Sequence, residues 1–158
     1  MQLGDIKLIL VPTDYSTASA HALRTAIALA RASGAEIQLF HVDVDPSTES
    51  VSPENIFPSQ MLFDSVRAET ATRLERVADE VREMGVRCTT VSHCGRSHAA
   101  IVEQARQARA DLVVVGRHPR HGFGRSLLGT VAARVAEKAP CAVLVVPPAD
   151  EPGVQASR

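Results

Sequence analysis

The sequence has no tryptophan and only one tyrosine, so its core must be built mainly from aliphatic side chains. It has no apolar run near the roughly 20 residues that a membrane-spanning helix needs, and its N-terminus shows no signal-peptide pattern. The three cysteines (Cys88, Cys94 and Cys141) form no CxxC motif and cannot all pair with one another. The net charge of -1 provides no basic field for nucleic acid or anionic lipid. These absences predict a soluble cytoplasmic protein that binds neither nucleic acid nor membranes.

The remaining composition favours a single α/β domain. A chain of 158 residues with 45% hydrophobic residues is long enough to bury a core without disulfides or metals. Its apolar residues are dominated by alanine and valine, as in many α/β proteins. We expect one domain over residues 1–150 and a polar, disordered tail over residues 151–158.

The first 43 residues show a strand, a helix and a second strand. Residues 6–14 are short and β-branched, and Pro12 is expected to end any central strand there. Apolar residues recur at helical spacing over 16–33, with Ser16 as a candidate N-cap and Gly34 as a candidate C-cap. Residues 35–43 read as the second strand, and the three elements together predict a parallel βαβ unit.

Residues 43–60 contain three prolines and no usable period, so we expect a flexible loop there. A functional flap and local disorder are both open interpretations. Beyond it, an apolar stripe at steps of three and four predicts a long helix that faces the sheet and stops at Gly85. The stripe consists of Val66, Thr70, Leu74, Val77, Val81 and Met84.

The same alternation continues to the end of the chain. Strands are expected at 86–92, 111–116 and 141–147, and helices at 99–108 and 130–138. Continuous apolar strands alternating with helices predict one open, five-stranded parallel sheet with helices on both faces.

Three of the predicted strands end in polar or turn-forming residues: "PTD" (12–14), "HVD" (41–43) and "GRHPRHGFG" (116–124). Ligands of open parallel sheets bind beyond the carboxyl ends of the strands, where helix N-termini favour phosphate. The usual nucleotide motifs are absent, because there is no GxxxxGK[ST] and "GFGRSL" lacks the last glycine of GxGxxG. There is also no GxSxG elbow, so hydrolase chemistry has no support in the sequence.

Several polar residues have two interpretations. Asp14 could cap the first helix or contact a ligand, and the two roles are compatible. Gly116 and Gly129 could be turn glycines only. His118 and His121 are more often solvated or phosphate-facing than catalytic in an exposed basic loop, so no catalytic residue is predicted.

No metal site is predicted either. The spacing of Cys88, His93, Cys94 and His98 matches no zinc template, and Cys88 and Cys141 are expected to be buried thiols. Asp43 and Asp45 could assist a divalent cation that arrives with a nucleotide, but solvated loop acids are the preferred interpretation.

Three stretches together resemble the universal stress protein family: "ILVPTDYSTASAHAL", "LFHVDV" and "VVVGRHPRHGFGRSLLGTVAARVAEKAPCAVLVVP". The resemblance covers residues 6–147 and every element in order. It implies a Rossmann-like, adenine nucleotide alpha hydrolase-like fold with strand order 3-2-1-4-5. It also implies that the ligand is ATP, with or without Mg²⁺, or a related adenine nucleotide.

The C-terminal stretch carries the most specific part of the resemblance. Nucleotide-binding members have a glycine, two residues, a glycine, nine residues, and then glycine with serine or threonine. Gly116, Gly129 and Thr130 fill three of these positions, but Pro119 stands at the second glycine. Proline has no N–H to donate, so one donor is missing, and Arg117, Arg120, Arg125 or the glycines at 122 and 124 could compensate for it.

The resemblance also implies a role for individual residues. Pro12 and Asp14 would line the adenosine part, and Val42 would lie against adenine. The phosphates would be surrounded by Val115, Gly116, Arg117, Gly129, Thr130 and Val131.

The sequence therefore predicts an ATP-binding regulatory protein of the stress response. The alternatives are a slow ATPase and a nucleotide-free structural or interaction protein, for which Pro119 is the best argument. The last strand is apolar on both faces, and the resemblance makes it an edge strand that pairs across a two-fold axis. A homodimer through residues 142–146 is expected.

Overall fold

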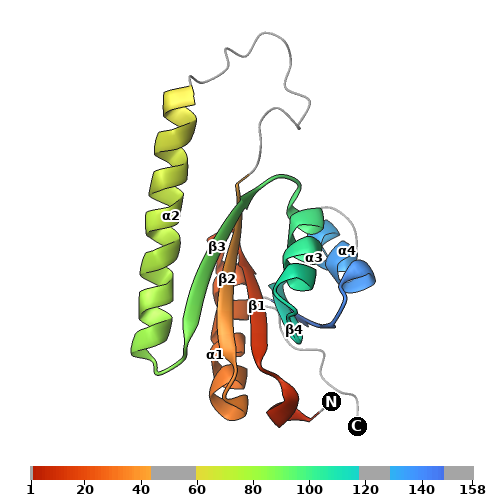
Figure 1. The fold of residues 1–158 in the computed structure, drawn as a ribbon. Coiled ribbons are helices and arrows are strands. Elements are labelled where there is room, and N and C mark those ends of the chain that lie inside the picture. Colours follow the sequence, from red (N-terminus) through yellow and green to blue (C-terminus); the bar gives the residue numbers. More distant parts are fainter. Residues whose placement is uncertain (1, 44–59, 118–128, 148–158) are drawn as a thin grey trace.

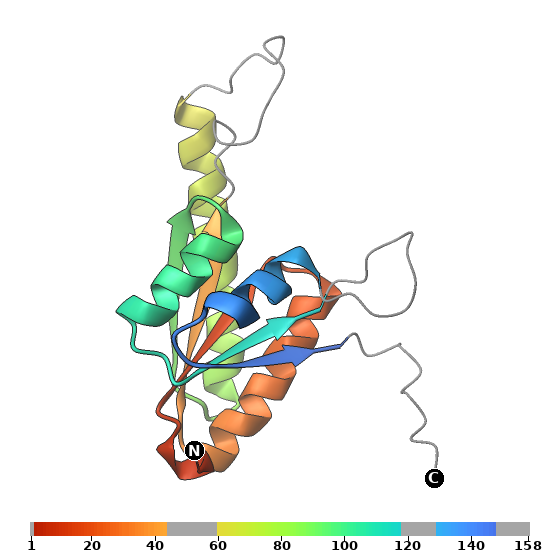
Figure 2. The same ribbon diagram turned by 90° about the vertical axis from the view of Figure 1, so that its right-hand side faces the viewer.

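The computed structural model describes residues 2–43, 60–117 and 129–147, which form a parallel sheet with helices on both faces (Figures 1 and 2). The strands lie in the order β3-β2-β1-β4-β5, and every neighbouring pair is parallel. Both the parallel sheet and its strand order confirm the prediction. The bounds are β1 Leu8–Thr13, β2 Glu36–Asp43, β3 Cys88–Cys94, β4 Leu112–Gly116 and β5 Ala142–Val146.

Four α-helices and one short 3-10 helix accompany these strands. They are η1 Leu3–Asp5, α1 Thr17–Ser33, α2 Gln60–Glu83, α3 Ser97–Gln107 and α4 Thr130–Lys138. As predicted, the Ser16 side chain caps α1 by accepting a hydrogen bond from the Ser19 N–H, at 3.2 Å. Gly34 ends the helix at φ 75°, a left-handed conformation that glycine adopts without steric cost.

The sheet divides the core into two layers. Alternate residues of each strand point to opposite faces, so Ile9 and Val11 pack with α1 and α2, whereas Leu10 pairs with the α3 and α4 side. The first layer includes Ile37, Leu39, Ala22, Ala26, Leu74 and Val81. The second includes Phe40, Val113, Ile101, Ala105 and Val135.

The strand β1 differs from the prediction at Pro12. It continues through Pro12 to Thr13, and Pro12 is buried opposite Phe40 of β2. Leu8 accepts the Asp111 N–H on the β4 side, and by alternation the missing N–H of Pro12 also falls on that side. Because β1 pairs with β4 only at Ile9 and Leu10, proline interrupts no ladder bond there.

Gly116 at the end of β4 allows α1 to come close. A Cβ atom at Gly116 would lie 2.5 Å from the Ala18 carbonyl oxygen and 3.0 Å from the Ser19 nitrogen. Both are backbone atoms of the first turn of α1, which therefore packs directly on β4. Glycine is required at this position for space.

The helix α2 is longer than its contact with the sheet, and its N-terminal turns extend past the strands (Figure 1). Leu74, Ala78 and Val81 are buried, but Met84 is 46% exposed, so the predicted stripe is wrong at its last member. The helix ends at Glu83, and Gly85 then turns the chain at φ 81°, so Met84 lies at the exposed end of the helix, where no further turn covers it. Within the described residues, no helix is both long and apolar enough to cross a membrane.

Some predictions fall outside the described residues. These concern Pro119, Arg120, Arg125, His118 and His121, the disordered tail, and nearly all of the flexible loop over residues 43–60.

Candidate functional site

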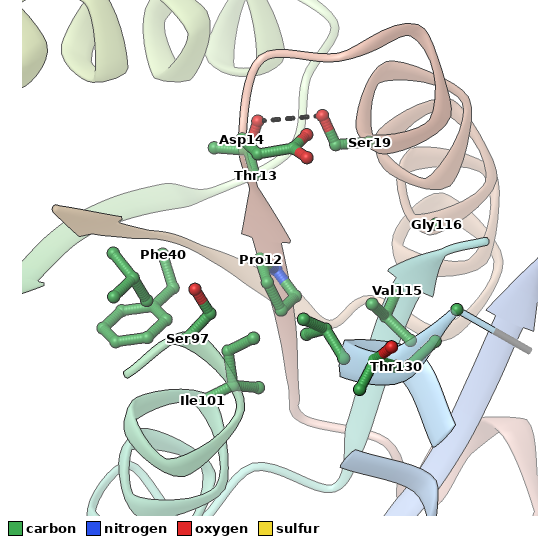
Figure 3. A pocket seen from close by; sticks show the side chains of 14 residues that line it. Pro12, Thr13, Asp14, Ser19, Phe40, Ser97, Ile101, Val115, Gly116 and Thr130 are labelled. Carbon is green, nitrogen blue, oxygen red and sulfur yellow. Dashed lines mark hydrogen bonds between the residues drawn. The ribbon is translucent and has the colours of Figure 1, made fainter. Parts of the chain in front are cut away.

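A pocket of about 320 Å³ opens at the carboxyl edge of the sheet, between β1 and β4 (Figure 3). These two strands are adjacent in the sheet but pair only at Ile9–Leu112 and Leu10–Val113, and beyond these pairs no ladder closes the gap. This is the point where strand order reverses, the usual ligand position in open α/β sheets. The lining residues are Pro12, Thr13, Asp14, Ser19, Phe40, Val42, Ser97, Ile101, Val115, Gly116, Gly129, Thr130, Val131 and Ala132.

The pocket brings together eight of the nine residues named from the sequence: Pro12, Asp14, Val42, Val115, Gly116, Gly129, Thr130 and Val131. Arg117 is the exception. Its backbone N–H donates to the Val146 carbonyl at 2.8 Å, which extends the pairing of β4 with β5 instead. The arginine was named for its guanidinium, whereas this contact involves only its backbone, one residue beyond the end of β4.

Sequence reasoning missed six lining residues: Thr13, Ser19, Phe40, Ser97, Ile101 and Ala132. Phe40 could have been found, because it lies two residues before Val42 and so shares its face of β2. Ser97 and Ile101 are one helical turn apart on α3, but no local pattern places this helix against β2. Their place in the site depends on tertiary packing.

One end of the pocket is apolar and comes from three different elements. Phe40 extends from β2, Ile101 from α3 and Pro12 from β1, and the Ser97 hydroxyl lies near them (Figure 3). Val42 of β2 also lines the pocket. Phe40 is only 1% exposed, so its ring is held in place by the second core layer. Such a fixed apolar surface suits an aromatic ring.

The opposite end is formed by the start of α4. Gly129 is the N-cap residue of α4 and provides no side-chain cap, whereas Ser16 caps α1 with its own hydroxyl. The first N–H groups of a helix have no partner within the helix and carry partial positive charge. Because Thr130, Val131 and Ala132 all line the pocket, this end favours an anion such as phosphate.

Asp14 lies in the turn between β1 and α1, at the rim of the pocket. Its Oδ1 accepts the Ser16 N–H at 3.0 Å, which is a bond within the turn and not a cap of α1, because Ser16 is the N-cap residue. The neighbouring Thr13 hydroxyl donates to the Ser19 hydroxyl at 3.3 Å (Figure 3) and accepts the Tyr15 N–H at 3.1 Å. The turn is therefore held by a set of short-range hydrogen bonds, and Asp14 is the single ionisable side chain among the described lining residues.

The other titratable candidates lie elsewhere. Asp43 is 3.6 Å from His41 Nε2 and does not line the pocket. Cys88 is buried as predicted, and burial raises the pKa of its thiol to about 11. Cys141 was also predicted to be buried, but it is only partly so, packed against the second core layer near the end of the sheet. No group of three His, Cys, Asp or Glu side chains suited to a metal ion occurs in the described part of the chain.

Comparison with known proteins supports one family throughout. The sequence model of the universal stress protein family matches residues 5–147. Universal stress protein MJ0531 of Methanocaldococcus jannaschii is 36% identical over 141 residues, which are 89% of this chain and 81% of that protein.

Solved structures agree in fold. Hypothetical protein MJ0577 of the same organism superposes with a TM-score of 0.74 at 27% identity, over 90% of this chain and 96% of that one. A universal stress protein in complex with cAMP gives a TM-score of 0.64 at 26% identity, over 90% and 98% of the two chains.

Proposed function

Because this chain belongs to the universal stress protein family, we propose that it binds an adenine nucleotide and acts as a nucleotide-dependent regulatory protein of the stress response. The pocket between β1 and β4 supports this proposal best. It combines an apolar surface with a helix N-terminus in one cavity, and these are the two surfaces that a nucleotide needs. A similar protein whose structure contains cAMP also supports an adenine ligand.

In the proposed complex, the base enters the apolar end. Phe40 and Ile101 would pack against the ring, and Val42 would offer its backbone polar groups to the base edge. The Asp14 carboxylate would accept hydrogen bonds from ribose hydroxyls, which suits a charged acceptor at the exposed rim of the pocket. Pro12 forms the floor between the two parts.

The phosphates would lie at the start of α4. The Thr130 hydroxyl and the amides of the first helical turn would donate to phosphate oxygens, next to Gly129, whose lack of a side chain lets the ligand approach. The ligand we favour is ATP, with or without Mg²⁺. Thr130 and Gly129 thus carry the phosphate part of the proposal.

A binding role is favoured over an enzymatic one. Catalysis of phosphate transfer or hydrolysis needs a positioned base or a metal ligand set beside the phosphates. Among the described lining residues the one ionisable side chain is Asp14, which lies on the rim near the proposed ribose position. A slow ATPase is therefore the weaker alternative.

Calorimetric titration tests the proposal. ATP, AMP and cAMP should each be titrated into the parent protein, into Thr130→Ala, and into Thr72→Ala as a matched control on α2, where Thr72 bonds only within its helix. We expect one site of submillimolar Kd, and a roughly tenfold or greater loss in Thr130→Ala, because a hydrogen bond to a charged group contributes about 1.5–3 kcal/mol. Thr72→Ala should match the parent.

Two outcomes would contradict the proposal. The absence of binding heat for all three nucleotides at millimolar concentration would leave the nucleotide-free interaction protein as the better function. Equal affinity of Thr130→Ala and the parent would mean that the phosphates lie away from α4.

We further propose a homodimer through β5. Within the described residues this strand pairs only with β4, and its Leu144 side chain is 36% exposed. An apolar edge strand of this kind is an aggregation risk unless a second chain covers it. Light scattering should give a dimer for the parent and a monomer for Leu144→Asp; a monomeric parent at micromolar concentration would refute the proposal. Val143 is a poorer position for this test because it packs against the second core layer.

The proposed location is the cytoplasm. Cys88, Cys94 and Cys141 are all free thiols, which is the usual state in a reducing compartment. Cell fractionation with an antibody against the protein would check this directly.

A further inference from the structure

Tyr15 has an unusual backbone conformation beside the pocket. Its φ is 61°, in the left-handed region that residues with a side chain normally avoid. It follows Asp14, which lines the pocket, and precedes Ser16, which caps α1. A strained residue persists only where its surroundings hold it, and such residues often mark functional sites.

The Tyr15 side chain is held from three sides, on the sheet face opposite the pocket. Its hydroxyl donates to the Thr70 carbonyl of α2 at 3.2 Å. The Arg73 guanidinium carbon lies 4.1 Å from the centre of its ring, a cation–π contact. The His41 ring lies 4.8 Å away, tilted by 32°. We call Tyr15, His41, Thr70 and Arg73 the Tyr15 clamp.

His41 ties the clamp to the sheet. Its Nδ1 is 2.8 Å from the Thr13 carbonyl oxygen, a distance at which an N–H donates to it. Its Nε2 lies 3.6 Å from the Asp43 carboxylate. The clamp therefore joins the ends of β1 and β2 to α2.

Two pocket residues are direct chain neighbours of clamp residues. Asp14 precedes Tyr15, and Val42 follows His41, with alternation along β2 sending His41 and Val42 to opposite faces. A ligand that contacts Asp14 or Val42 therefore acts on a residue that shares a peptide bond with a clamp residue. The two faces of the sheet are coupled at this edge.

We propose that Tyr15 is a positioning residue for ligand binding, and that its clamp transmits occupancy of the pocket to α2. This inference rests on the proposed nucleotide function. The clamp holds the left-handed turn that presents Asp14 at the pocket rim, so free and bound proteins differ in how tightly Tyr15 is held. α2, which projects beyond the sheet, receives the change through Thr70 and Arg73 (Figure 1).

A purely structural role for Tyr15 predicts different behaviour. Its ring also packs against the first core layer, so its removal costs stability in either case. Tyr15→Gly separates the two roles, because glycine adopts the left-handed conformation without strain but has no ring for the clamp. If only the shape of the turn matters, Tyr15→Gly keeps the affinity of the parent.

The first measurement is the affinity for ATP by calorimetry. The variants are Arg73→Gln and Tyr15→Gly, with Arg76→Gln as a matched control, since Arg76 is an exposed arginine on the same helix and is not part of the clamp. We expect Kd to rise roughly threefold to tenfold in both clamp variants, as for the loss of one cation–π contact or hydrogen bond. Arg76→Gln should bind like the parent. The stoichiometry reports the folded fraction of each variant.

The second measurement uses the fact that Tyr15 is the only tyrosine in the chain. Ring-labelled tyrosine therefore gives NMR signals from Tyr15 alone. If the ring had only a structural role, these signals would not shift when ligand is added. ATP should shift these signals in the parent with the same Kd that calorimetry gives. The shift should shrink in Arg73→Gln.

The outcomes separate this inference from the proposed function. Binding heat with unmoved Tyr15 signals and an unchanged Kd in Arg73→Gln and Tyr15→Gly would overturn the clamp and leave nucleotide binding intact. If the parent gives no binding heat with ATP, both the proposed function and the clamp are overturned.

Discussion

Replacing Gly116 with alanine is the sharpest test of how the pocket is built. The added Cβ would lie 2.5 Å from the Ala18 carbonyl oxygen and 2.6 Å from its carbon, so the first turn of α1 or the end of β4 has to move by about 1 Å. Overpacking of this kind typically costs about 2 kcal/mol. Both partners are backbone, so no side chain can rotate away to relieve the contact.

The assay is urea unfolding followed by nucleotide titration. With a urea dependence of about 2 kcal/mol per molar, a loss of about 2 kcal/mol lowers the unfolding midpoint by about 1 M. The same shift of α1 moves Ser19, which lines the pocket and bonds to Thr13, so the affinity for ATP should also fall.

Gly34→Ala is the matched control. An added Cβ at Gly34 would meet no atom within 4 Å, so alanine causes no collision there. Because φ is 75°, alanine introduces only backbone strain of about 1 kcal/mol. It lies at the far end of α1, so the free energy of unfolding should fall while the affinity stays constant. If Gly116→Ala keeps the unfolding midpoint and the affinity of the parent, the close packing of α1 on β4 is wrong.

Three further predictions concern the pKa of Tyr15, the pKa of Cys88 and the backbone donor missing at Pro119. Burial raises the pKa of Tyr15, and the positive charge of Arg73 opposes this effect, so Arg73→Gln should raise that pKa further; alkaline titration of the single tyrosine's absorbance measures this. The pKa of Cys88 rises on folding from about 9 to about 11, so its contribution to stability is complete below pH 9 and is lost as pH rises through 11. The free energy of unfolding of Cys88→Ala should thus fall less steeply than the parent's over that window. Pro119→Gly adds one backbone N–H donor, so its ATP affinity should equal or exceed the parent's in calorimetry, and a loss would refute the role assigned to that position.

The helices and strands could be predicted from local pattern alone. Ser16 and Gly34 bound α1 as expected because capping depends on neighbouring residues only. The predicted ends of helices and strands were less accurate where an element includes polar residues next to its apolar ones. Residues 97–107 form α3, where the prediction was 99–108, and β3 runs two residues later than expected. The strand order came from family resemblance, because periodicity does not determine which strands are neighbours.

In the candidate site, too, the residues set by local sequence could be predicted and those set by tertiary packing could not. Residues at strand ends, such as Pro12 and Gly116, line one pocket as expected, because the carboxyl ends of parallel strands share one edge. Phe40 and Ile101 depend on how α3 packs on β2, and nothing local encodes that. The Tyr15 clamp was not predicted, since its members come from β2, α2 and the turn after β1.

The central claim, that an adenine nucleotide binds between β1 and β4, is tested most directly by backbone amide NMR of the isotope-labelled protein with ATP. The account predicts saturable shifts at Asp14, Val42 and Thr130, which line the pocket, and none at Gly34 at the opposite end of α1. Unchanged signals at all three pocket residues in the presence of millimolar ATP would contradict it.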